Sequence, residues 1–289
     1  MFTCLNPGAI GIGGVSLEES LKLAADAGFQ GLDLPVETAA DIVEEHGADH
    51  IRKLYDDAGL RIGGWGLPVN FRDGDDEFQE GLNKFPRMAK IAGELGAVWC
   101  ATWVSPCSDS LDYWTNFELH ANRLRECALV LRENCCRLGL EFVGPWNSRN
   151  GQKYPFIFDI PGMLKLNRAI GTGNVGLLLD AWHWYTSFGD LGDLLKLDSC
   201  DVVYVHVNDA PAGISADEQL DHIRTLPGKT GVIELVGFFK TLNLIGFDGP
   251  VVVEPFNEEL KEIAKQDPAG AAKKTADALN GVWKEAGLS

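Results

Sequence analysis

Short apolar segments alternate with amphipathic helical segments from one end of this 289-residue chain to the other. A fully buried parallel strand is a continuous apolar run, whereas a helix covering a sheet is apolar on one face only. The strand pattern occurs eight times, at 2–6, 31–35, 60–67, 97–104, 140–144, 175–180, 202–207 and 250–254. Helical patterns lie between these segments, at about 17–28, 39–58, 76–95, 112–138, 162–170, 189–196, 233–244 and 267–285.

Eight strand–helix units without a linker or a break in composition predict a single (β/α)8 TIM barrel, an α/β fold that occupies residues 1–289. A doubly wound parallel sheet is the competing architecture, but it usually has fewer strands and often a glycine-rich phosphate-binding turn. The glycine-rich segment at 11–14 lacks the complete G-x-G-x-x-G spacing of that turn. The strand count therefore favours the barrel.

The composition excludes several classes of protein. A net charge of -17 repels phosphate backbones, so we expect no nucleic-acid partner. The chain lacks an apolar run long enough to span a membrane, and residues 1–7 lack the basic and apolar regions of a secretory signal. The seven cysteines form no C-x-x-C pair, which argues against a disulfide framework or a cysteine zinc site. These features predict a cytoplasmic protein with mostly buried thiols.

One side chain that can bind a metal lies at the C-terminal end of each of four consecutive predicted strands. They are Glu141, Asp180, His206 and Glu254. A lone acid at a strand end more often caps a loop or helix, and a lone histidine in a strand is usually part of the core. Four at one barrel mouth are different, because unpaired carboxylates raise one another's pKa and destabilise the fold. A divalent cation removes that penalty, and this oxygen-rich set favours Mn²⁺, with Mg²⁺ or Co²⁺ as alternatives.

These residues occur in ordered motifs that resemble a known family. The chain is similar to the xylose isomerase-like TIM barrel superfamily, in the sugar phosphate isomerase/epimerase branch that includes D-tagatose 3-epimerase-like enzymes. The motifs are Leu140-Glu141-Phe142, Leu179-Asp180-x-x-His183, His206-Val-Asn-Asp209, Arg224-x-x-Pro227-Gly228 and Glu254-Pro255.

The resemblance implies that Glu141, Asp180, His206 and Glu254 hold one divalent metal. It also implies that Glu141 and Glu254 are the catalytic residues, which flank the substrate and move protons. His183 and Arg224 would bind substrate oxygens. A second metal is not expected, because Asp209 is the only nearby candidate ligand after the histidine of the seventh strand.

The chemistry of the residues agrees with these roles. A metal that chelates a carbonyl and its neighbouring hydroxyl acidifies the C–H between them, so a carboxylate can remove that proton and leave a metal-bound enediolate. Return of the proton from the other face gives epimerisation, and its return to the neighbouring carbon gives isomerisation. We therefore predict a divalent-metal-dependent sugar isomerase or epimerase. The alternative is a dehydratase or lyase that acts on a keto-sugar or keto-inositol with the same site.

Other residues are candidates for the substrate pocket. Arg224 lies on the long segment 208–231, from which it can reach a substrate oxyanion or phosphate; the alternative is a surface arginine. Asp33 is expected to anchor the pocket floor. Tryptophans near strand ends either belong to the core or stack on the apolar face of a sugar ring. Those predicted to bind substrate are Trp65, Trp103, Trp146 and Trp184.

Two rival functions fit the residues less well. A metal-dependent endonuclease of the same superfamily would need several more histidines for three zinc ions and a basic groove, whereas this chain has six histidines and is acidic. A non-catalytic sugar-binding barrel would be expected to lose one of the two acid/base glutamates, and both are present. We therefore expect a small carbohydrate as the partner, with a slight preference for an unphosphorylated one. Relatives often form dimers or tetramers, so a homo-oligomer is compatible with the sequence.

Overall fold

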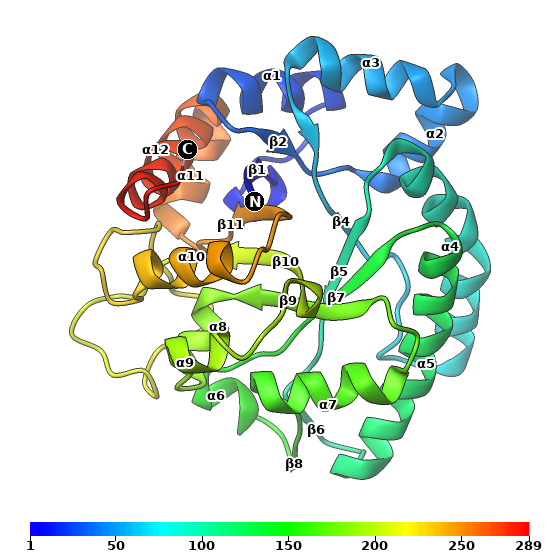
Figure 1. Cartoon of the computed structure of the whole chain (residues 1–289), viewed down its shortest axis with the longest axis vertical. Coiled ribbons are helices and arrows are strands. Elements are labelled where there is room, and N and C mark those ends of the chain that lie inside the picture. Colours follow the sequence, from blue (N-terminus) through cyan, green and yellow to red (C-terminus); the bar gives the residue numbers. More distant parts are fainter. Residues whose placement is uncertain (289) are drawn as a thin grey trace.

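The main sheet contains only parallel pairings, in the order β3-β2-β1-β11-β10-β9-β7-β5-β4. In this computed structural model, which describes residues 1–288, the sheet is curled into a barrel surrounded by helices (Figure 1). The strands are β1 (Phe2–Leu5), β2 (Gly31–Leu32), β3 (Arg61–Ile62), β4 (Trp65–Gly66), β5 (Trp99–Trp103), β7 (Arg137–Glu141), β9 (Val175–Asp180), β10 (Val202–Val207) and β11 (Pro250–Val253).

The barrel closes through the third predicted strand, which the structure divides into β3 and β4. β3 pairs with β2 and β4 pairs with β5, so the two ends of the strand order are joined by Gly63 and Gly64. Gly63 continues the pairing, because its N–H donates to the carbonyl oxygen of Leu32 at 2.8 Å. A Cβ atom at Gly64 would lie 2.3 Å from the ring of Tyr204 inside the barrel. Glycine is therefore required where this strand passes closest to the interior, and the eight-strand prediction holds.

Helices cover the outside of the barrel, as expected for alternating β and α units. The larger ones are α1 (Leu17–Ala27), α2 (Val36–His46), α3 (Ala48–Ala58), α4 (Asp75–Leu95), α5 (Tyr113–Glu133), α7 (Ile160–Ile170), α10 (Leu235–Leu244), α11 (Glu258–Gln266) and α12 (Pro268–Glu285). Shorter elements are η1 (Gly8–Ile10), α6 (Trp146–Arg149), α8 (Ala181–Thr186), α9 (Leu191–Leu194), η2 (Ser199–Asp201), and the antiparallel pair β6 (Cys107–Ser108) and β8 (Tyr154–Pro155).

Two helix predictions were wrong. The single helix expected over 39–58 is two helices, because Gly47 has a φ of 83°, a left-handed value that interrupts helical geometry. α11 was not predicted at all; it begins at Glu258 and is capped by Asn257, whose side chain accepts from the N–H of Leu260. Among residues 1–288, no helix combines the length and apolar character needed to cross a membrane. All seven cysteines are free thiols, and only Cys135 and Cys200 are exposed.

The barrel interior determines which side chains reach the mouth. Its apolar filling includes Leu178 on β9, Tyr204 on β10 and Val252 on β11. Successive side chains of a strand alternate between the two faces, so the residue two positions further on points the same way. Two positions on from these three lie Asp180, His206 and Glu254. Three of the four predicted metal ligands therefore lie two positions beyond a core residue that faces the barrel interior, so their side chains point the same way.

Candidate metal centre

The four predicted metal ligands lie together at the C-terminal mouth of the barrel. One ligand atom from each of Glu141, Asp180, His206 and Glu254 lies within 4.8 Å of the others. The Nδ1 atom of His206 is 3.4 Å from Oε1 of Glu141 and 3.6 Å from Oε2 of Glu254. Glu141 ends β7, Asp180 ends β9 and Glu254 directly follows β11. Strands that are separate in sequence therefore build one compact group of three carboxylates and an imidazole.

Two atoms of this group are buried without a hydrogen-bond partner in the described part of the chain. They are Oε1 of Glu141 and Nδ1 of His206. A buried polar atom without a partner costs about 1–3 kcal/mol, and more if it is charged. Both atoms face the centre of the four-residue group, where a divalent cation would satisfy them. The donor set of carboxylate oxygens and one imidazole nitrogen fits such an ion.

The pKa values of the group show why it needs a cation. Burial raises the pKa of Glu141, and the negative charges of Glu254 and Asp180 raise it further. Burial alone would lower the pKa of His206, but Glu254 and Glu141 outweigh it and hold that pKa well above its usual range. Without a metal, the group therefore retains protons on His206 and Glu141. A divalent cation would replace them.

Asp180 is fixed by three hydrogen bonds. Its Oδ1 accepts from the backbone N–H of Trp182 at 2.8 Å and from the amide of Asn208 at 3.1 Å. Its Oδ2 accepts from Nη1 of Arg224 at 2.8 Å. The first bond makes Asp180 the N-cap of α8. The two alternative roles considered for this residue, helix cap and metal ligand, are therefore compatible.

In the structure, Arg224 holds the carboxylates of Asp180 and Glu254 in place by hydrogen bonds. Its side chain is fully buried, and Nη1 also donates to Oε2 of Glu254 at 3.1 Å. Nε donates to the backbone oxygen of Asp221, and Nη2 donates to Oδ1 of Asp221 at 2.9 Å. These bonds use four of the five N–H groups of the guanidinium, so the predicted pairing of Arg224 with a substrate oxyanion could use only one Nη2–H without breaking them. The guanidinium borders the pocket, but its hydrogen bonds go to protein groups.

His183 presents a neutral hydrogen-bond donor beside the metal centre. The backbone N–H of Gly144 donates to its Nδ1 at 3.2 Å, which assigns the ring hydrogen to Nε2. Burial lowers the pKa of His183 to about 3, so the ring is uncharged at neutral pH. Nη2 of Arg224 lies 3.4 Å from Nε2, and with this tautomer both of those atoms carry hydrogen. His183 is thus suited to donate to a substrate oxygen, as predicted for it.

A pocket of about 370 Å³ opens beside the metal centre. Glu141, Glu254 and His183 line it. Sequence reasoning missed five of the lining residues, Pro106, Val143, Ser148, Asp221 and Phe256. Each lies two or three positions from a predicted site residue, and that proximity was the signal available. The lining residues are Trp103, Pro106, Glu141, Val143, Ser148, His183, Asp221, Arg224, Glu254 and Phe256.

The four predicted substrate-binding tryptophans separate into different environments. Trp103 lines the pocket and is 46% exposed. Trp146 is exposed on α6, outside the pocket lining. Trp184 is in the core, where its ring packs on Phe238 and its Nε1 donates to the backbone oxygen of Asp190 at 3.3 Å. The prediction that Trp184 stacks on substrate is corrected, because its side chain faces the helix layer.

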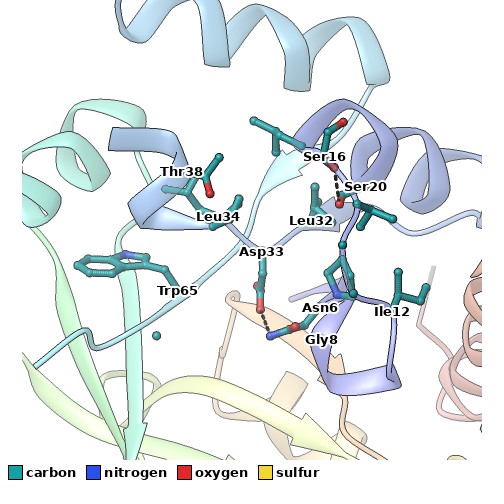
Figure 2. Close-up of a pocket in the computed structure, with 17 residues that line it drawn as sticks. Asn6, Gly8, Ile12, Ser16, Ser20, Leu32, Asp33, Leu34, Thr38 and Trp65 are labelled. Atoms are coloured by element: carbon teal, nitrogen blue, oxygen red, sulfur yellow. Dashed lines mark hydrogen bonds between the residues drawn. The ribbon is translucent and has the colours of Figure 1, made fainter. Parts of the chain in front are cut away.

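Trp65 borders a second cavity, of about 320 Å³, at the ends of β1, β2 and β4 (Figure 2). Its Nε1 donates to the backbone oxygen of Ala97 at 2.8 Å, so the polar end of this tryptophan is turned away from the pocket beside the metal centre. Asp33 and Asn6 also face this cavity, joined at 3.1 Å. Asp33 accepts from the hydroxyl of Tyr204, and burial raises its pKa to about 6. Asp33 therefore ties the floor of this cavity to the barrel interior.

Asp209 is fully buried and anchors the long segment that carries Arg224. Its Oδ2 accepts from the backbone N–H groups of Thr230 and Gly231 at 2.9 and 2.7 Å, and its Oδ1 accepts from that of Ile233 at 3.0 Å. Both carboxylate oxygens are thus committed to the end of the segment. Asp209 is therefore placed as the anchor of this loop.

Comparisons with known proteins agree with this architecture. The family described as "Xylose isomerase-like TIM barrel" matches residues 21–281. A solved xylose isomerase domain protein from Alicyclobacillus acidocaldarius is 31% identical, with a TM-score of 0.85 and 99% of each chain covered. Inosose isomerase from Halalkalibacterium halodurans is 23% identical over 90% of each chain. A 3-dehydroshikimate dehydratase from Pseudomonas aeruginosa is 27% identical over 92% of this chain, which spans 39% of that protein's length.

Proposed function

The chain belongs to the xylose isomerase-like TIM barrel family, and we propose that it is a divalent-metal-dependent isomerase or epimerase of a small carbohydrate ketone. The observation that carries this proposal is the pair of glutamates, Glu141 and Glu254, which both line the pocket and lie 3.4 and 3.6 Å from Nδ1 of His206. Two carboxylates that face one substrate can remove a proton and return one. We propose Mn²⁺ as the ion, because oxygen ligands dominate the site.

The two glutamates are set up for different proton-transfer roles. Burial alone would raise the pKa of Glu254, but the positive charges of His206 and Arg224 outweigh it and keep this carboxyl ionised. Glu254 is therefore suited to accept the proton from carbon. Glu141, whose raised pKa applies to the metal-free group, would be ionised beside a bound cation and would serve as the second carboxylate that exchanges a proton with the substrate. The ion supplies the Lewis acidity that makes the C–H beside a carbonyl removable.

His183 adds a neutral hydrogen-bond donor to the two glutamates in the pocket. Its neutral Nε2–H can donate to the substrate carbonyl or hydroxyl without adding charge to the pocket. Burial of the ring at 2% exposure fixes its direction, which favours one orientation of the substrate. Orientation matters because the two glutamates act on opposite sides of the same carbon.

A dehydratase or lyase remains the second candidate, since it needs the same proton removal. The relatives favour both outcomes, because one is named an isomerase and another a dehydratase. The deciding experiment incubates the purified protein with Mn²⁺ in D₂O and a panel of ketoses, inosose and 3-dehydroshikimate. Deuterium at the carbon beside the carbonyl with an epimer or isomer as product supports the proposal. Water loss as the net reaction supports the second candidate, and absence of both exchange and product excludes the two.

A further inference from the structure

We propose that this pocket selects an uncharged polyhydroxy ketone and that Asp221 is the specificity-determining residue that excludes phosphorylated and carboxylated ones. This inference rests on the proposed function, because it concerns what binds beside the same metal centre. It adds to that function the charge class of the substrate and a residue outside the metal ligands and the proton-transfer pair.

Arg224 fixes one carboxylate oxygen of Asp221, and the other oxygen is free to contact a ligand. The residue lines the pocket, and its side chain is 33% exposed. Its Oδ1 accepts from Nη2 of Arg224 at 2.9 Å, and its backbone oxygen accepts from Nε of Arg224 at 3.0 Å. Its Oδ2 has no hydrogen-bond partner between residues 1 and 288. Arg224 therefore orients a carboxylate whose second oxygen is available to a ligand.

The pocket offers an anion no counter-charge beyond the metal. Arg224 is the only arginine or lysine in the lining among the described residues, and its hydrogen bonds go to protein groups. Two other arginines near the mouth lie outside the lining. Arg72 stacks on the ring of Trp103 at 4.1 Å, and Arg149 stacks on Phe158 at 4.3 Å. A phosphate or carboxylate in the pocket would therefore meet Asp221 without a free cation beside it.

Asp221 and His183 together match a hydroxyl group. Nδ1 of His183 is 3.9 Å from Oδ1 of Asp221, so the two side chains are neighbours in the pocket wall. His183 offers a hydrogen-bond donor at Nε2, and Asp221 offers an acceptor at Oδ2. The hydroxyl groups of a polyhydroxy ketone donate and accept, so such a ligand can satisfy both groups, whereas a fully ionised phosphate or carboxylate has no hydrogen to donate. Placing a second negative charge against a fixed carboxylate costs binding free energy.

The test compares pairs of ligands in which one member carries an anionic group and the other does not. It measures the binding of L-ribulose against L-ribulose 5-phosphate, and of 3-dehydroshikimate methyl ester against 3-dehydroshikimate, to the full chain supplemented with Mn²⁺. We expect the uncharged member of each pair to bind at least about tenfold more tightly. Asp221→Asn keeps an oxygen for Arg224 but removes the charge, so this preference should fall by about tenfold. Asp221→Glu, which restores the charge, should recover it, and Asp217→Asn, on an exposed part of the same segment, should leave it unchanged.

The outcomes separate this inference from the proposed function. Equal binding within a pair, tighter binding of the anion, no binding of either uncharged ketone, or an unchanged preference in Asp221→Asn would each overturn the role of Asp221. If the preference for uncharged ligands holds but none of them exchanges a C–H proton, the reaction is wrong and the selectivity stands. If exchange occurs with the anionic ketones as readily as with the uncharged ones, the reaction stands and the selectivity is wrong.

Discussion

Arg224 donates to Asp180 across 2.8 Å, and the side chains of both residues are completely buried. This contact joins the long segment after β10 to the C-terminal end of β9, at the substrate pocket that Arg224 also lines. The same guanidinium nitrogen lies 3.1 Å from Glu254. The metal centre is therefore held by a loop residue, Arg224, as well as by the barrel strands.

Arg224→Met should weaken metal binding and destabilise the fold. Removing one partner of a buried ion pair leaves an uncompensated charge and costs about 3–5 kcal/mol. Here Asp180 would keep two of its three hydrogen bonds, but Glu254 would lose its side-chain donor. Urea unfolding and Mn²⁺ titration measure the two effects. Arg168→Met, at an exposed position, is the control. A variant with wild-type stability and metal affinity would show that Arg224 is not a support.

Glu141→Gln and Glu254→Gln should each reduce C–H exchange at least about 100-fold, the usual contribution of a positioned acid or base. Glutamine has the same shape as glutamate but cannot accept the proton from carbon. Deuterium incorporation measured by NMR gives the rate, and circular dichroism checks the fold. Glu118→Gln changes an exposed residue of α5 and should leave the rate unchanged. Full activity in either of the first two variants would refute the two-glutamate mechanism.

The metal-free protein should become less stable as the pH rises from about 6.5, the ordinary pKa of histidine, to about 8. Burial raises the pKa of Glu141 above its ordinary value of 4.5, and Glu254 and Glu141 raise that of His206 despite its burial. A group with a raised pKa in the folded state contributes stability that is complete below its unfolded pKa and is lost as the pH rises through its folded pKa. Glu254, whose pKa is lowered, loses its contribution only below this window.

Bound Mn²⁺ should oppose this trend, because it takes the place of the protons and binds more tightly as the pH rises. Urea unfolding at three pH values, with EDTA and with Mn²⁺, measures both effects. In Glu141→Gln with EDTA, the slope with pH should be smaller, since one of the two groups no longer titrates. Stability that increases with pH across this window in EDTA would contradict the shared-proton description of the group.

Much of the site was predictable because a parallel barrel places the ends of its strands at one mouth. Asp180, His206 and Glu254 each lie two positions beyond an inward-facing apolar residue, so strand assignment alone sets their direction. The sequence also identified Glu141, and all four lie within 4.8 Å of one another. The alternation of side chains along each strand therefore determines where these residues lie.

The directions in which the tryptophan side chains point were not predictable in the same way. Strands of a parallel barrel are buried on both sides, so an apolar run does not reveal which residues point inward and which point to the helices. Trp103 ends β5 and lines the pocket, whereas Trp184 lies on α8, a short helix that the sequence did not predict, and packs on Phe238 of α10. The partners of Arg224 were also hidden, because its position depends on how the whole segment 208–231 folds back over the site. Contacts made by a long loop leave no periodic pattern in the sequence.

Asp209→Ala should loosen the segment that carries Arg224 without changing the number of metal ions bound. The side chain accepts three hydrogen bonds from backbone N–H groups beyond Ala210, and the loss of each bond leaves a donor that costs about 1–3 kcal/mol if it stays buried. We expect lower stability, faster hydrogen exchange at 225–233, and one metal ion per chain in both proteins. Elemental analysis counts the ions. A wild-type count of two that falls to one in the variant would make Asp209 a metal ligand.

Trp103→Ala and Trp184→Ala should have opposite effects, although both residues were candidates for sugar stacking. Trp184 is buried against Phe238, so its removal should cost about 3–5 kcal/mol of stability. Trp103 is half exposed and contacts Arg72, so its removal should cost only about 0.5–1 kcal/mol. Its ring borders the pocket, and we therefore expect weaker ketose binding in Trp103→Ala alone. Unfolding curves and ketose titration of both variants measure the two effects. Tight ketose binding by Trp103→Ala would show that substrate does not contact this wall, and a stable Trp184→Ala would contradict its place in the core.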